Sequence, residues 1–197
     1  VVVPNYNYAS HLANRIDTAL NQGFPIYELI VLDDRSTDDS VAVAQRLLAH
    51  LDMDWSLHVN EHNSGSPCRQ WLNGAARATG DFVWIAEADD LTLPGFLEVT
   101  LPAFHDRDVV MSYCQSQQMA GDGAILCPHY LDYVADIDAE KWRSNHIAGG
   151  RDEIRGVLAV KNTIPNVSAC VFRRDALVGA LQAHIEDIAQ YRIAGDW

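Results

Sequence analysis

Acidic side chains follow two apolar runs of the chain. Asp33 and Asp34 come directly after YELIVL, and Glu87, Asp89 and Asp90 come at the end of FVWIAEADD. Such carboxylates can hold a hard divalent cation, which prefers oxygen ligands, or accept hydrogen bonds from ribose hydroxyls and base N–H groups. One acidic pair alone is a common solvated turn. Two pairs after two buried strands favour a ligand site, because function concentrates in such loops.

The first apolar run, VVV, ends in Pro4-Asn5-Tyr6-Asn7. A dinucleotide-binding site would have G-x-G-x-x-G at this point, and a phosphate-binding loop would have G-x-x-x-x-G-K-[ST]; the sequence has neither. A cation bound by carboxylates could neutralise phosphates in place of a glycine loop. Since Tyr6 also offers a flat face to a base, the pattern predicts binding of a nucleotide-activated donor.

Strands and helices are expected to alternate up to about residue 91. The predicted strands are Val1–Pro4, Tyr27–Leu32, Trp55–Val59 and Phe82–Ala86. Continuous apolar strands are typical of a parallel sheet that is covered on both faces. Right-handed crossovers place the strand exits of such a sheet at one edge, where ligands bind in open α/β folds. The acidic segments should therefore lie in a site rather than in the core.

The second half of the sequence is less regular. It predicts an extended, antiparallel element, a polar loop-rich stretch, a further strand and two helices, at residues 108–119, 121–155, 168–173, 176–181 and 185–191. The predicted fold is a Rossmann-like α/β/α sandwich with a mostly parallel central sheet and a small antiparallel element in the second half. We expect one domain over residues 1–197, with a nucleotide-binding half to about residue 91 and an acceptor-side half over about 92–197.

Composition narrows the function classes. A net charge of −13 argues against a nucleic-acid groove, which needs a basic stripe. No apolar run is long enough to span a bilayer, and no secretory leader is visible. The cysteines are widely spaced with no C-x-x-C pair, which is typical of reduced thiols: Cys68, Cys114, Cys127 and Cys170. We therefore expect a cytoplasmic protein.

The sequence starts at Val1 without an initiator Met and stops at AGDW. We therefore expect the sequence to be a fragment that is truncated at both ends. Association with the inner face of a membrane would depend on segments outside this chain.

Several motifs together resemble the inverting family 2 glycosyltransferases, which have the GT-A fold. They occur in family order and at family-like spacings over nearly the whole chain: VVVPNYNYASHL, ELIVLDDRSTDDS, NSGSPCRQWLNGAARATGDFVWIAEADDL, NVSACVFRRDAL and AGDW. The resemblance implies transfer of a sugar from a nucleoside-diphosphate sugar to an acceptor hydroxyl, with inversion. It also implies a bacterial protein of polysaccharide or cell-wall glycan biosynthesis.

The resemblance implies roles in binding the nucleotide. Tyr6 would stack on the nucleobase with the Pro4 backbone beside it. Asp34 would accept a hydrogen bond from the base ring N–H. In the DxD-like element, Asp89 would face the ribose and Asp90 would ligate Mg²⁺ or Mn²⁺ bridging the diphosphate.

The resemblance also places Asp196, in Gly195-Asp196-Trp197, where the family keeps its general base. Two positions depart from the family pattern. Gly195 replaces the acid that usually precedes the base, and Trp71 stands where the family often has an Arg. Arg69, two residues earlier, would serve the diphosphate instead.

Alternatives stay open at this point. The resemblance favours UDP over dTDP and GDP without excluding either, and it leaves the sugar and the acceptor unidentified. A scaffold or nucleotide-sugar-binding domain without turnover would have the same fold. A sugar nucleotidyltransferase also places acids at parallel-strand exits, but it would normally need a glycine-rich, basic loop where Tyr6 and Asn7 stand. Asn166 and Ser168 could line the acceptor side or form a turn before a buried strand.

Overall fold

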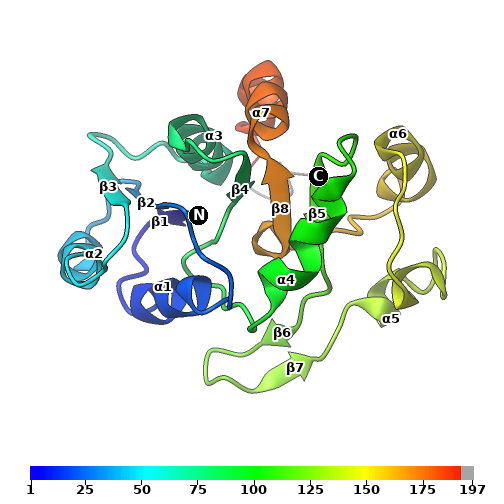
Figure 1. The fold of residues 1–197 in the computed structure, drawn as a ribbon, viewed down its shortest axis with the longest axis horizontal. Helices are drawn as coiled ribbons and strands as arrows, with labels where there is room; N and C mark the ends of the chain where they lie inside the picture. Colours follow the sequence, from blue (N-terminus) through cyan, green and yellow to red (C-terminus); the bar gives the residue numbers. More distant parts are fainter. Residues whose placement is uncertain (192–197) are drawn as a thin grey trace. The chain divides into compact units, whose positions relative to one another are not determined.

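The computed structural model describes residues 1–191 of the chain (Figure 1). The described residues form two compact units. The first contains residues 1–114 and 167–191, and the second contains residues 115–166.

A parallel sheet forms the start of the first unit. Its strands are β1 (Val2–Asn5), β2 (Leu29–Asp33) and β3 (Trp55–Val59), in the order β1-β2-β3. Both pairs are parallel, which confirms the prediction for this part of the chain. The β1 and β2 side chains are buried throughout, as expected for strands covered on both faces.

A second sheet has the order β4-β8-β5, with β4 at Phe82–Trp84, β8 at Cys170–Arg173 and β5 at Met111–Tyr113. Its pairs are antiparallel. A parallel bridge between Val2 and Ile85, with a 2.8 Å hydrogen bond from Ala86 N–H to the Val2 carbonyl, sets the chain after β4 beside β1. The chain therefore leaves β1, β2 and β4 at the same edge, which we call the site edge.

Helices cover both faces of these strands (Figure 1). The helical elements of the first unit are α1 (Leu12–Leu20), α2 (Ser40–Leu48), α3 (Pro67–Arg77), α4 (Phe96–Thr100), the 3₁₀ turns Leu101–His105 and Val167–Ala169, and α7 (Arg174–Ile188). The predicted helices 176–181 and 185–191 are one helix, α7. Its middle residues continue the helix because none of them is a proline.

The core has two layers because successive strand residues point to opposite faces. Val3, Val31 and Trp84 pack with the buried faces of α1, α2 and α4. Val2 and Ile85 pack on the other face, with α3 and α7. Both layers lie beneath the site edge and hold its strands in register.

Helix α3 lies very close to β1 at Gly74. A Cβ atom at this position would come within 2.3 Å of Val2 Cγ1 and 3.0 Å of Leu32 Cδ1. Only a glycine allows this approach, so Gly74 fixes how α3 presents its earlier residues to the site edge.

The second unit is built from short elements. These are β6 (Gln118–Met119), β7 (Ile125–Cys127), α5 (Leu131–Val134), the 3₁₀ turn Lys141–Arg143, α6 (Gly150–Glu153) and a π-helical turn at Ile154–Leu158. β6 and β7 form an antiparallel pair. The expected element over 108–119 is thus two strands, β5 and β6, in separate sheets. Among the described residues, no helix has both the length and the apolar character needed to cross a bilayer.

Candidate active site

The exits of β1 and β2 are joined directly at the site edge. The Asp34 backbone N–H donates to the Asn5 carbonyl at 2.8 Å. Asp33 is 1% exposed and accepts hydrogen bonds from Asn5 Nδ2 (2.8 Å), Ser36 N–H (2.8 Å) and Ser36 Oγ (2.6 Å). Asp33 therefore braces the two strand ends and the chain that leads to α2.

Asp34, 5% exposed, organises the segment between β3 and α3. Its Oδ1 accepts from Asn60 Nδ2 at 2.7 Å, from Ser64 N–H at 2.8 Å and from Gln70 Nε2 at 3.0 Å. Its Oδ2 accepts from Ser64 Oγ at 2.8 Å. The Asn63 amide also donates to the Asp34 carbonyl at 2.8 Å. The carboxylate is thus fixed in one orientation before any ligand arrives.

The exit of β4 forms a turn over residues 87–90, which we call the acidic turn. The Asp90 N–H donates to the Glu87 carbonyl at 3.1 Å and closes this turn. The Glu87 N–H donates to Ser168 Oγ at 3.0 Å, and the Trp84 indole N–H donates to the Ser168 carbonyl at 2.8 Å. Ser168, 4% exposed, therefore holds the start of the acidic turn.

Helix α3 contacts both acidic exits through consecutive residues. Gln70 Nε2 donates to Asp34, and the Trp71 indole N–H donates to Glu87 Oε1. The position at which Trp71 departs from the family pattern thus contacts the acidic turn through a neutral donor. α3 couples the predicted base-binding and metal-binding parts of the edge.

Tyr8, from the segment after β1, hydrogen-bonds Asp89. The pKa of Tyr8 is raised, first by the negative charge of Asp89, then by burial and by this hydrogen bond, and further by Glu87 and Asp90. The direction of the shift shows that Tyr8 is influenced by the negative charges of Asp89, Glu87 and Asp90.

Arg15 lies beneath the acidic turn and is 0% exposed. Its Nη1 donates to the Asp90 carbonyl at 3.1 Å and its Nη2 to Thr92 Oγ1 at 2.9 Å. Its guanidinium lies 5.0 Å from the Trp84 ring centroid. Burial lowers the pKa of Arg15 to about 10, and the charges of Asp90 and Glu87 oppose that shift. Arg15 thus stays protonated at neutral pH.

The donors at the acidic turn suit a hard divalent cation. Asp90 is half-buried and Asp89 is exposed, and both offer carboxylate oxygens. Within residues 1–191, no group of three or more His, Cys, Asp or Glu side chains converges as a metal cage. Mg²⁺ commonly uses one or two carboxylates and takes its other ligands from water and substrate phosphates. The residues present therefore fit a cation that arrives with a diphosphate.

The sequence-predicted nucleotide residues all lie on the described part of the first unit. Pro4 is buried at the end of β1, and Tyr6, just after it, is 46% exposed. Asp34, Asp89 and Asp90 follow β2 and β4 at the site edge.

The structure gives Arg69 a protein partner. Its guanidinium donates to Glu186 on α7 at 3.0 and 3.2 Å, on the surface of the first unit. The pKa of Arg69 is raised and that of Glu186 is lowered, in both cases first by this hydrogen bonding. Asp196, the predicted general base, lies outside the described residues.

Sequence reasoning missed Tyr8, Arg15 and Gln70. Only Arg15 left a readable signal, because it falls on the buried stripe of α1 between Leu12 and Ile16, where an apolar residue is expected. Its charge on that stripe requires a partner on another element.

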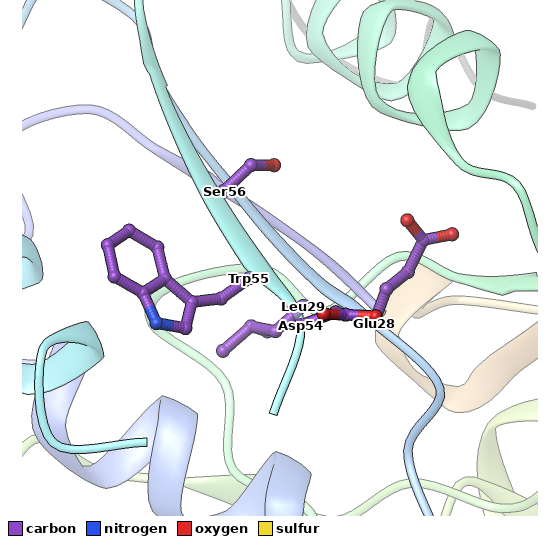
Figure 2. A pocket seen from close by; sticks show the side chains of 5 residues that line it. All are labelled: Glu28, Leu29, Asp54, Trp55 and Ser56. Atoms are coloured by element: carbon purple, nitrogen blue, oxygen red, sulfur yellow. The ribbon is translucent and has the colours of Figure 1, made fainter. Parts of the chain in front are cut away.

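A small pocket lies at the opposite edge of the parallel sheet (Figure 2). It is lined by Glu28, Leu29, Asp54, Trp55 and Ser56, at the amino ends of β2 and β3, and has a volume of about 100 Å³. Pockets for drug-sized ligands usually have volumes of about 300–1,000 Å³. This pocket is too small for a nucleotide and lies apart from the acidic exits.

Comparison with known proteins gives a consistent result. A model described as Glycosyl transferase family 2 matches residues 1–178. A Bacillus subtilis glycosyltransferase, TuaG, provisionally named for teichuronic acid biosynthesis, is 30% identical over 128 residues, which are 64% of this chain and 49% of TuaG. The chain spans about half the length of such curated relatives.

Solved structures share the fold. A mannosyltransferase from Pyrobaculum calidifontis, in complex with GDP-Man and Mn²⁺, is 25% identical, with a TM-score of 0.55 over 59% of this chain and 34% of that chain. S. aureus TarS residues 1–349, in complex with UDP, has a TM-score of 0.63 at 15% identity, over 99% of this chain and 51% of that chain. The predicted GT-A type of α/β fold is confirmed.

Proposed function

Because the chain belongs to glycosyltransferase family 2, we propose that it transfers a sugar from a nucleoside-diphosphate sugar to an acceptor hydroxyl, with inversion at the anomeric carbon. One observation carries the proposal: Asp34 and the acidic turn lie at the same sheet edge and are contacted by consecutive residues of α3. Open α/β folds bind their ligands at this edge.

The nucleotide would bind over the β1 and β2 exits. Tyr6 would stack on the base, with the Pro4 backbone beside it, and Asp34 would accept from a base N–H. The exposed ring of Tyr6 supports the stacking role, and the place of Asp34 directly after β2, at the site edge, supports its role in recognising the base. We favour UDP, and the GDP-Man complex of the Pyrobaculum neighbour makes GDP the second candidate.

The acidic turn would hold the diphosphate end of the donor. Asp89 would face the ribose and Asp90 would ligate Mg²⁺ or Mn²⁺, as the Mn²⁺ in the Pyrobaculum neighbour supports. When bound, such an ion supplies Lewis-acid stabilisation for the departing diphosphate. Arg69 would add a positive charge if it left Glu186.

Asp196 would take the proton from the acceptor hydroxyl as it attacks the face opposite the nucleotide. General-base help of this kind typically contributes about 10²–10⁴-fold to the rate. The matching position of Asp196 in the family pattern supports the assignment. We assign acceptor recognition to the half that includes residues 115–166, and the name of TuaG supports a bacterial cell-wall or polysaccharide acceptor.

Calorimetric titration with UDP and GDP, with and without Mn²⁺, tests the donor site. We expect Mn²⁺-dependent binding that is lost in Asp90→Ala and kept in Asp52→Ala. Asp52 is the matched control because it is exposed and precedes β3, at the opposite edge. Unchanged binding by Asp90→Ala would remove Asp90 from the metal site.

Product analysis separates the function classes. A glycosyltransferase releases a nucleoside diphosphate, whereas a nucleotidyltransferase releases pyrophosphate. A scaffold domain would bind the nucleotide and release neither. For Asp196→Asn we expect donor binding to be retained and transfer to be lost; transfer at the parental rate would exclude Asp196 as the base.

A further inference from the structure

We infer that Arg15 is a positioning residue for the acidic turn: from beneath, it holds the Asp90 backbone where the Asp90 carboxylate can take a divalent cation. This inference rests on the proposed function, since the cation is part of it. Arg15 touches neither the nucleotide nor the cation in this proposal and acts only through Asp90.

The contacts of Arg15 fix the turn from the side of the core. The bond from Nη1 goes to the Asp90 carbonyl, and the bond from Nη2 goes to Thr92 two residues later. The Trp84 ring under the guanidinium is the same ring whose indole N–H holds the Ser168 carbonyl. Because Ser168 in turn accepts from the Glu87 N–H, both ends of the acidic turn are anchored to one connected set of side chains.

Stability alone gives no reason for an arginine at this position. Arg15 shares the buried face of α1 with Leu12, Ile16 and Ala19. Burying a guanidinium is costly even when it is hydrogen-bonded, and replacing buried ionic groups by well-packed apolar residues often leaves stability unchanged or higher. The guanidinium differs from an apolar side chain here because it has two donors directed at the acidic turn and the chain after it.

Charge supports the same role. The acidic turn brings Glu87, Asp89 and Asp90 together, and their mutual repulsion would open it. Arg15 is a buried positive charge whose pKa both Glu87 and Asp90 raise, so all three groups interact. A fixed cation beneath the turn keeps it closed from the side of the core.

The test is a Mn²⁺ titration, followed by the electron paramagnetic resonance signal of free Mn²⁺, with UDP or GDP present. Groups that hold a metal ligand in place typically contribute about 10- to 100-fold to metal affinity. We expect Arg15→Met, which keeps length and loses the donors, to bind Mn²⁺ weaker by about that factor. Arg15→Lys, which keeps the charge and one donor direction, should recover part of the affinity.

A second pair of variants applies if Arg15→Met does not fold. Thr92→Val removes the acceptor of Nη2 with little change in shape, and Thr92→Ser keeps it. We expect Thr92→Val to weaken Mn²⁺ binding on the order of threefold, as for one lost hydrogen bond, and Thr92→Ser to match the parent.

The outcomes distinguish this inference from the proposed function. If the parent binds Mn²⁺ with nucleotide and the folded Arg15 and Thr92 variants bind it equally well, with only their melting temperatures changed, Arg15 is merely structural and the inference is wrong. If the parent itself shows no nucleotide-dependent Mn²⁺ binding, the metal part of the proposed function fails, and the inference fails with it.

Discussion

The indole N–H of Trp71 donates a hydrogen bond to the carboxylate of Glu87 and so joins helix α3 to the chain that leaves β4. The preceding residue, Gln70, bonds the carboxylate of Asp34. A small rotation of α3 would therefore disturb the β2 exit and the β4 exit together. The tight packing of Gly74 on β1 opposes such a rotation.

Replacing Trp71 should measure the strength of this link. Hydrogen bonds to charged groups contribute about 1.5–3 kcal/mol, so we expect Trp71→Phe to lower the free energy of unfolding by about that amount plus a packing term. A double-mutant cycle with Glu87→Ala, which removes the acceptor, isolates the link when the variants are compared by urea denaturation. A coupling energy near zero would show that the bond is not formed in solution.

Asp34 should prove necessary for the stability of the fold as well as for nucleotide binding. Asp34→Ala leaves Asn60, Ser64 and Gln70 without their acceptor, so we expect unfolding to become easier by at least about 2 kcal/mol. Asp34→Asn should keep more of the stability and still weaken UDP binding. Asp39→Ala, at an exposed acid nearby, is the control and should change neither; equal losses in all three variants would contradict the assignment.

Tyr8 offers a test of the charge at the acidic turn. Its raised pKa means that the fold favours the neutral phenol. The contribution of Tyr8 to the free energy of unfolding is fully present below the ordinary tyrosine pKa. It is lost as the pH rises through the raised pKa. In an ultraviolet titration, taken as the difference from Tyr8→Phe, Asp89→Asn should lower the pKa of Tyr8. Asp81→Asn, on the chain before β4, should leave it unchanged.

Two glycine-to-alanine changes test the packing of α3. Gly74→Ala forces a methyl group against Val2 and should destabilise the fold by about 1–3 kcal/mol. Gly179→Ala, in the open part of α7, meets no atom within 4 Å and should stabilise by about 0.5–1 kcal/mol. Chemical denaturation of both variants gives the comparison. A neutral Gly74→Ala would mean that α3 can move away from β1.

Arg69 can be tested with nucleotides that differ in phosphate content. If it serves the diphosphate, Arg69→Ala should weaken UDP binding and leave uridine binding unchanged. Glu186→Gln, which removes the charge that holds Arg69 at the surface, should strengthen UDP binding or leave it as it is. Equal affinities of the parent and Arg69→Ala for UDP would confine Arg69 to its surface contact with α7.

The sequence predicted the parts of the fold that depend on local pattern. Continuous apolar runs located β1, β2 and β4, and alternation located β3. The expected parallel course of these strands then predicted that Asp34 and the acidic turn lie at one edge. The β4–β8 pairing joins segments nearly ninety residues apart, for example Val83 with Phe172, and no local pattern specifies such a partner. The sequence could not predict the contacts of Arg69 and Arg15 for the same reason. Their partners, Glu186 and Asp90, come close to them only after folding.

The ends of β5 and β8 lie side by side, with Tyr113 opposite Cys170 and the Cys114 N–H bonded to the Ala169 carbonyl at 3.1 Å. Everything from 115 to 166 therefore leaves and rejoins the first unit at neighbouring points, as an insertion does. Residues 115–166 could therefore be exchanged for the corresponding segment of a relative without lengthening any linker. If residues 115–166 recognise the acceptor, as proposed above, such chimaeras should keep the nucleotide specificity of this chain and take on the acceptor preference of the relative.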